Sequence, residues 1–207
     1  MEIANICKKK KHIPFFDSAY QGFASGDIIK DAYAVRLFSK LGFELICSQS
    51  FAKNFGLYGE RIGAVHLICK NEKLKEIITS QMKLIVRGMY SSPPLHGARI
   101  VSRILNNENL YSLFEEDLKK MSNRIIEMRK RLFDSLIKLN TPGNWDHILN
   151  QIGMFTFTGL NPNQVERMVN HFHIYMISNG RISMAGLNES NVDYVASSIF
   201  DCVTKIK

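Results

Sequence analysis

The first half of the chain alternates short apolar runs with segments of helical periodicity. Apolar runs at 13–16, 43–47 and 62–69 predict strands. Residues 27–41 and 71–86 repeat apolar side chains at helical spacing and predict amphipathic helices. This order of segments favours an α/β fold in which parallel strands are joined by crossover helices.

The pattern changes in the second half of the chain. A Ser-Ser-Pro break precedes Pro94, which suits the start of a helix, and residues 109–139 predict one long charged helix. Shorter segments follow, with strands predicted at 153–158, 174–177 and 181–184 and helices predicted at 163–171 and 191–206. We therefore expect a small α+β module, with the change of domain inside the long helix near residue 120.

Polar residues directly follow two of the predicted strands. Asp17 ends the first apolar run, and a polar loop at 48–61 follows the second. Ligands of parallel sheets bind beyond the carboxyl ends of the strands. The pattern alone therefore predicts a ligand site around Asp17 and this loop.

The formal net charge of +8 suits three kinds of partner: nucleic acid, a membrane surface or small anionic ligands. The sequence has no nucleic-acid motif, and aromatic residues do not interleave its basic ones. It also has no run of 18 apolar residues. We therefore expect neither nucleic acid nor a membrane as partner, and an enzyme that handles anionic ligands explains the charge.

The four cysteines are widely spaced and form no C-x-x-C pair, so a zinc site is not expected. Cys47 and Cys69 lie in apolar runs, which predicts buried thiols in a reducing compartment. His171 and His173 flank a phenylalanine and do not form a ligand set. We expect no metal.

Lys53 stands in a pattern with known chemistry. Residues 50–53 read Ser-Phe-Ala-Lys and fit S-x-x-K, which also marks serine acyl-enzymes of the penicillin-binding type. The S-D-N and K-T-G segments of those enzymes are absent from the sequence, which argues against that chemistry. A loop lysine taken alone is usually solvated, so the neighbouring segments decide its role.

Five segments carry a family resemblance. They are F-F-D-S-A-Y-Q-G-F at 15–23, C-S-Q-S-F-A-K-N-F-G-L-Y-G-E-R-I-G at 47–63, R-G-M-Y-S-S-P-P at 87–94, Q-I-G-M-F at 151–155 and N-G-R-I at 179–182. In this order, and over nearly the whole chain, the sequence resembles the aspartate aminotransferases. These are fold-type I enzymes that depend on pyridoxal 5′-phosphate.

The resemblance implies this cofactor and assigns residues that hold it. Lys53 matches the lysine that attaches to the cofactor and later moves the proton of the substrate Cα. Asp17 matches the carboxylate that pairs with the pyridine nitrogen and keeps the ring protonated. Tyr20 matches the phenol that bonds the ring oxygen. Ser50 and Arg61 match phosphate ligands, because hydroxyl and guanidinium groups suit a dianion.

Two arginines match substrate ligands of the family. Arg181 matches the arginine that grips the substrate α-carboxylate. Arg87 matches the arginine that reaches into the neighbouring subunit's site and binds the side-chain carboxylate, although Gly88 replaces the proline expected beside it. The resemblance therefore implies a homodimer with shared active sites. Its substrates would be dicarboxylic amino acids and 2-oxo acids, with aspartate and 2-oxoglutarate giving oxaloacetate and glutamate.

The resemblance also implies the domain organisation. Residues 1–120 would form the C-terminal portion of the large cofactor-binding domain, a mostly parallel sheet with flanking helices, and 121–207 a small α+β domain. Roughly as much chain again precedes the matching segment in family members. We therefore expect a fragment with little transaminase activity by itself. The family has cytosolic and mitochondrial branches, and we expect an intracellular protein, with the cytoplasm slightly favoured over the mitochondrial matrix.

Two alternatives stay open. One is an aminotransferase of broader or aromatic specificity. The other is a non-catalytic or inactive truncated paralogue that acts only by pairing with other chains. The presence of Asp17, Tyr20, Lys53, Arg61 and Arg181 favours an intact catalytic site.

Overall fold

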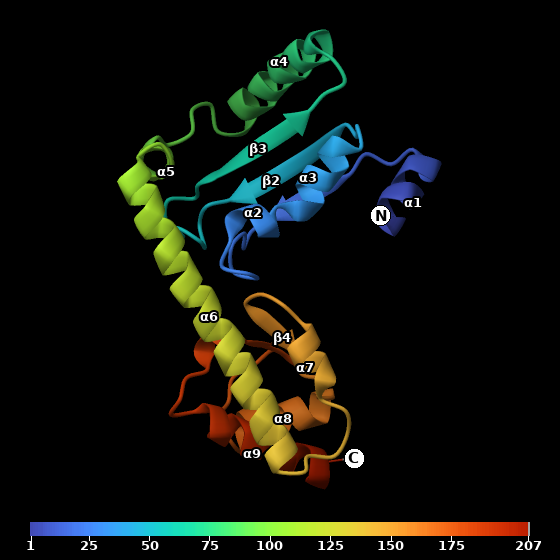
Figure 1. The fold of residues 1–207 in the computed structure, drawn as a ribbon, viewed down its shortest axis with the longest axis vertical. Helices are drawn as coiled ribbons and strands as arrows, with labels where there is room; N and C mark the ends of the chain where they lie inside the picture. The colour runs from blue at the N-terminus through green and yellow to red at the C-terminus, as the bar shows by residue number, and fades with distance from the viewer. Residues whose placement is uncertain (207) are drawn as a thin grey trace. The chain divides into compact units, whose positions relative to one another are not determined.

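The computed structural model describes residues 1–206 and divides into two compact units (Figure 1). The first unit comprises Met1–Gly22 and Asp27–Leu118. The second comprises Phe23–Gly26 and the described part of Lys119–Lys207. The boundary falls inside the long helix α6, Glu108–Lys138. No helix among residues 1–206 is long and apolar enough to cross a membrane.

A three-stranded sheet organises the first unit, with β2 between its two neighbours (Figure 1). The strands are β1 (Phe15–Ser18), β2 (Leu45–Ser50) and β3 (Gly63–Ile68), so the three predicted strands are confirmed. Strand β1 pairs with β2 in parallel, as predicted. Strand β3 pairs with β2 in the antiparallel sense, so the expectation of parallel pairing was wrong there.

The connections explain this difference in strand direction. A parallel partner needs a crossover of a dozen or more residues, usually a helix. Two short helices, α2 (Ile28–Asp31) and α3 (Tyr33–Lys40), lie between β1 and β2 and provide that crossover. Residues 51–62, which join β2 to β3, fold as turns, and a turn connection returns the chain antiparallel.

The single helix predicted over 27–41 is divided into α2 and α3 at Ala32, whose φ of −80° and ψ of 4° leave the helical range. Asp27 caps α2 by accepting hydrogen bonds from the amides of Ile29 and Lys30. At the other end of α2, the Asp31 carboxylate accepts the Gly22 amide at 2.6 Å. The division therefore lets α2 hold the turn that follows β1.

One face of the sheet packs against α3 and against α1 (Glu2–Lys10). Ala4, Phe38, Leu45 and Cys47 form the buried cluster there. The Phe38 ring meets the Phe16 ring of β1 nearly edge to face, with 5.3 Å between centroids. Such an aromatic pair contributes roughly 0.5–1.5 kcal/mol beyond area burial. This packing holds β1 beside β2. It therefore also fixes the position of Asp17, which follows Phe16 in β1.

Two further helices complete the first unit: α4 (Glu72–Met89) and α5 (His96–Leu105). Asn71 caps α4 by accepting the Leu74 amide at 2.9 Å. Each of the 18 residues of α4 is at least partly exposed, including the apolar Ile77, Leu84 and Ile85.

The second unit surrounds the C-terminal part of α6. Its other elements are α7 (Asp146–Asn150), β4 (Phe155–Phe157), α8 (Pro162–Asn170), β5 (Arg181–Ser183), η1 (Met184–Gly186) and α9 (Val192–Lys205). Strand β4 pairs antiparallel with β5. The strand predicted at 174–177 was wrong: this described segment joins neither sheet, and the Ile174 amide donates to the Met168 carbonyl. Fully buried apolar side chains fill this unit, among them Leu132, Leu136, Ile148, Met184 and Ile199.

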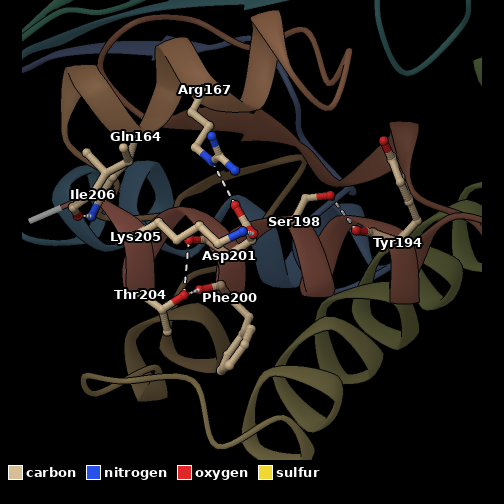
Figure 2. Close-up of polar contacts among 9 residues, drawn as sticks. All are labelled: Gln164, Arg167, Tyr194, Ser198, Phe200, Asp201, Thr204, Lys205 and Ile206. Carbon is tan, nitrogen blue, oxygen red and sulfur yellow. Dashed lines mark hydrogen bonds and ion pairs between the residues drawn. The ribbon is translucent and has the colours of Figure 1, made fainter.

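A polar network joins α8 to α9 (Figure 2). Arg167 Nε donates to Asp201 Oδ1 at 2.7 Å, and Lys205 Nζ lies 2.5 Å from Asp201 Oδ2. Gln164 Nε2 donates to the Ile206 carbonyl at 2.9 Å. The hydrogen bond from Lys205, and after it the one from Arg167, lower the pKa of Asp201. The Asp201 carboxylate therefore links the two helices in its charged form.

Gly22 provides a test of packing in the first unit. Its φ of +95° disfavours other residues, and an added Cβ would overlap Cδ2 of the buried Leu118. We predict that Gly22→Ala lowers the free energy of unfolding by about 3 kcal/mol or more, measured by urea denaturation. Gly42→Ala is the control, because Gly42 has φ +77° with no atom within 4 Å of an added Cβ. Gly42→Ala should lower the free energy of unfolding by only about 1 kcal/mol. Equal losses in the two variants would contradict the packing explanation.

Asp201→Asn tests the link between α8 and α9. The folded pKa of Asp201 lies below its unfolded value, so its contribution is present above about pH 4 and is lost as pH falls through the folded pKa. We predict that the variant loses roughly 1 kcal/mol of stability at pH 7. The difference from the unsubstituted chain should shrink below about pH 4 in denaturation curves measured across pH. A difference that stays constant down to about pH 2 would contradict this account.

Candidate functional site

The carboxyl ends of β1 and β2 meet at one edge of the sheet, because the two strands are parallel. Asp17 pairs with Ser48 in the register, and Ser50 is the last residue of β2. The antiparallel β3 begins at the same edge, where Gly63 pairs with Ser50. The prediction that Asp17 and the loop after β2 share one edge is therefore confirmed.

An open pocket of about 440 Å³ lies at this edge. Three predicted site residues line it, namely Asp17, Ser50 and Arg61. Tyr90 and Pro93, which follow α4, line it as well. The residues lining this pocket therefore come from β1, from β2 and its loop, from the start of β3, and from the break between α4 and α5.

Lys53 and Tyr20 meet in the loops beyond the strands. The Lys53 ammonium lies over the Tyr20 ring, 5.4 Å from its centroid, and both side chains are half-buried. A cation over an aromatic face is attracted by the ring quadrupole. The structure therefore brings together the predicted attachment lysine and the predicted phenol, although neither lines the pocket itself.

Gln21 and Gln49 connect these loops, and the sequence interpretation did not include them. Gln49 Nε2 donates to Gln21 Oε1 at 2.6 Å, and Gln21 Nε2 donates to the Ile28 carbonyl at 2.8 Å. The buried Asn54 donates through Nδ2 to the Gln21 carbonyl at 3.3 Å. These bonds tie the Lys53 loop and the end of β2 to the turn that holds Tyr20. The sequence signal that could have identified Gln21 and Gln49 is their position next to Tyr20 and Ser50 in the two motif segments.

Gly63 allows β3 to begin close against β2. An added Cβ would lie 2.7 Å from the Gln49 carbonyl oxygen, well inside van der Waals contact. Gly63 also lines the pocket. Any side chain at this position would push the pocket wall away from the loop that follows Ser50.

Asp17 brings an unneutralised charge to the pocket. Its side chain is exposed, and no hydrogen bond or ion pair to it is found within residues 1–206. Burial raises the pKa of the Cys47 thiol, and the negative charge of Asp17 raises it further. The carboxylate is therefore available to a positively charged ligand group.

Ser50 and Arg61 offer groups of the opposite kind. Ser50 Oγ accepts the Ala52 amide at 3.2 Å, which leaves its hydroxyl proton available to an acceptor. Arg61 is exposed, and its Nη1 donates to the Tyr58 carbonyl at 3.1 Å. Its φ of 52° is unusual for a residue with a side chain. A ligand with a cationic group for Asp17 and an anionic group for Arg61 would match this pocket.

The two predicted substrate arginines are not among the residues that line this pocket. Arg87 is exposed in the last turn of α4 and does not line the pocket of its own chain. Arg181 is the exposed first residue of β5 in the second unit, and its amide donates to Asn179 Oδ1 at 3.0 Å. Its guanidinium lies over the Phe155 ring, 4.7 Å from the centroid.

Solved structures of aminotransferases share this fold. The broad specificity aminotransferase from Leishmania mexicana matches with a TM-score of 0.96 and 44% identity, covering 99% of this chain and 50% of that one. The aspartate aminotransferase from Saccharomyces cerevisiae cytoplasm matches with a TM-score of 0.94 and 47% identity, covering 100% and 52%. The chain therefore has part of the α/β fold of the aminotransferases, over about half of the length of these proteins.

The sequence places the chain within one family of that class. Residues 1–199 match Aminotransferase class I and II, and the chain belongs to this family. The cytoplasmic aspartate aminotransferase of Dictyostelium discoideum is 52% identical over 202 residues, which are 98% of this chain and 46% of that protein. The predicted resemblance is confirmed, and the chain spans about half the length of the curated relatives it matches. Members of this family depend on pyridoxal 5′-phosphate.

Proposed function

We propose that this chain carries the cofactor lysine and the substrate arginines of an aspartate aminotransferase. The reaction would transfer the amino group of L-aspartate to 2-oxoglutarate and give oxaloacetate and L-glutamate. The observation that carries the proposal is the Lys53 amine over the Tyr20 ring, in the loops beside a pocket lined by the unneutralised Asp17. Relatives named aspartate aminotransferase, about half identical to this chain, support it.

The residues at the sheet edge fit pyridoxal 5′-phosphate. The unneutralised Asp17 would accept a hydrogen bond from the pyridinium nitrogen. The hydroxyl of Ser50 and the guanidinium of Arg61 would bind the phosphate. Tyr20 would donate to the ring oxygen, and Lys53 would provide the amine of attachment. A cavity of about 440 Å³ lies within the range of small-ligand sites.

Once bound, the cofactor supplies an electron sink for the charge left on the substrate Cα. The released Lys53 Nζ would take the proton from that carbon as a general base and return it on the product side. Arg181 would hold the substrate α-carboxylate through two parallel N–H bonds. The bonds from Gln49 and Asn54 to Gln21 keep the Lys53 loop against the Tyr20 turn and so limit the positions the amine can adopt.

Arg87 would select dicarboxylic substrates from a second copy of the chain. Its exposure in the last turn of α4 and its absence from the lining of its own pocket agree with a role across a subunit boundary. We therefore propose a homodimer with shared sites. Within each subunit, residues 1–120 would belong to the large cofactor-binding domain and 121–207 to the small one. A cytoplasmic location is proposed because the Dictyostelium and yeast relatives are named as cytoplasmic.

Nitrogen transfer provides the test of this proposal. The 207-residue chain would be incubated with the cofactor, [¹⁵N]aspartate and 2-oxoglutarate, and labelled glutamate would be measured by mass spectrometry. This readout detects slow turnover. We predict labelled glutamate above the level given by cofactor alone, and a loss of about 100-fold or more of that excess in Lys53→Ala, because the general base is removed.

Lys83→Ala is the matched control, because it removes an exposed lysine from α4. It should transfer nitrogen as the unsubstituted chain does. If Lys53→Ala matches this control, Lys53 is not the base and the proposal is wrong. If the unsubstituted chain gives no more label than cofactor alone, the transfer function of this chain is wrong.

Broader specificity is the second candidate, since the Leishmania mexicana protein is named a broad specificity aminotransferase. The same assay with [¹⁵N]phenylalanine separates the two. Faster transfer from aspartate, lost in Arg87→Ala, supports selection of dicarboxylates. Equal transfer from both donors, unchanged in that variant, supports the broader specificity.

A further inference from the structure

Arg129 is a buried cation on α6. The residue is only 4% exposed. Nη1 donates to the Ile148 carbonyl at 3.1 Å and to the Thr156 hydroxyl, and Nη2 donates to the carbonyls of Gly153 and Phe155 at 2.7 and 3.1 Å. Three of these four acceptors belong to one short stretch, 153–156.

Every one of these acceptors is neutral. Within residues 1–206 no carboxylate forms an ion pair with Arg129, and burial lowers the pKa of its guanidinium. Buried charges usually pair with an opposite charge, because desolvation is costly. Here the planar guanidinium instead donates hydrogen bonds to four neutral acceptors. Because the guanidinium is rigid, these bonds also fix the orientation of the acceptors. Arg129 therefore acts on the geometry of residues 153–156.

That stretch carries the aromatic support of Arg181. In the β4–β5 ladder, Phe157 lies opposite Arg181, and Phe155 lies two residues before Phe157 on the same face. The side chain between them, Thr156, is fully buried and bonds to Arg129. Arg129 thus holds β4 from its inner face, while the outer face presents the Phe155 ring beneath the Arg181 guanidinium.

Arg124, also on α6, holds the chain after β5. Its Nη1 donates to the Leu187 carbonyl at 2.6 Å and its Nη2 to the Ala185 carbonyl at 2.7 Å. Residues 185–187 follow the strand that begins with Arg181. Arg129 therefore fixes the segment that leads into β4, and Arg124 fixes the segment that leaves β5.

We propose that Arg129 and Arg124 are positioning residues that set the direction of the Arg181 guanidinium toward a substrate carboxylate. The proposal rests on the proposed function only where it assigns that carboxylate to Arg181. Replacement of Arg129 by lysine would keep the charge and lose the fork, because one ammonium has three donor hydrogens and cannot satisfy all four acceptors. The stretch 153–156 would then shift, and with it the ring under Arg181.

The first readout needs no ligand. Side-chain ¹⁵N NMR of the full 207-residue chain reports the Arg181 Nε–H proton, which the Phe155 ring current should move upfield. The signal is assigned by its loss in Arg181→Lys. We expect the upfield displacement to collapse in Arg129→Lys. Arg167→Lys is the matched control, because it breaks an arginine contact in the same unit, to Asp201, and should leave the signal in place.

The second readout is the affinity for succinate, a dicarboxylate probe, measured in the same spectra. We expect binding about tenfold weaker in Arg129→Lys, comparable to the loss of one charge-assisted hydrogen bond, and unchanged binding in Arg167→Lys. If Arg129→Lys does not fold, Arg124→Lys decides, because Arg124 is exposed and its replacement disturbs the core least. A smaller loss of the upfield displacement is expected there.

The two readouts separate the two ideas. An Arg181 signal without an upfield displacement, or one unchanged in both Arg129→Lys and Arg124→Lys, overturns the positioning role whatever succinate does. A signal that responds in these variants, with no succinate binding to the unsubstituted chain, supports the positioning role and contradicts the carboxylate assignment of Arg181. Equal loss of succinate affinity in Arg129→Lys and Arg167→Lys overturns the inference, because general destabilisation then explains it.

Discussion

The pairing of β2 with a strand on each side determines where every candidate cofactor ligand of the first unit lies. The parallel register places Asp17 beside Ser48, and the antiparallel register places Gly63 beside Ser50. A slip of one residue in either ladder would turn every side chain of the shifted strand to the other face of the sheet. In β1 it would move Asp17 away from the pocket and bury a charge against Cys47, whose thiol already lies within the influence of that carboxylate.

Arginine serves two different purposes in this chain. Arg61 and Arg181 are exposed, and their guanidinium groups keep donors available for an anionic ligand. Arg129 is buried and donates hydrogen bonds to four neutral acceptors, so it organises the backbone of β4. Both uses depend on the same planar fork, which a lysine does not possess. The difference lies in burial and in the partners, and composition does not reveal it.

Sequence periodicity predicted the strands around Phe16, Cys47 and Val65, because apolar residues there are continuous enough to mark buried or paired segments. It did not predict the direction of β3, since direction depends on the path of the connecting turns. It predicted a strand at 174–177 that the structure lacks in that described segment, because an apolar run forms a strand only where its backbone pairs with another strand, and the Ile174 amide bonds to the Met168 carbonyl instead.

The candidate site likewise contains residues that the sequence indicated and residues that it did not. Motif segments pointed to Asp17, Tyr20 and Lys53, and the structure brings the last two together. Gln21 and Gln49 were missed because their partners include a backbone carbonyl and each other, 28 residues apart in the chain. Arg129 and Arg124 were missed for the same reason, since backbone carbonyls leave no pattern in a sequence.

The central claim is that the fold singles out Lys53 as the amine that receives the cofactor. It is tested most directly by incubating the chain with limiting pyridoxal 5′-phosphate, reducing with borohydride and mapping the modified peptides by mass spectrometry. The account predicts that the modification concentrates at Lys53 and spreads to other lysines when Asp17 is replaced by asparagine. Modification spread over exposed lysines such as Lys83 in the unsubstituted chain, with Lys53 no more reactive than the others, would contradict it.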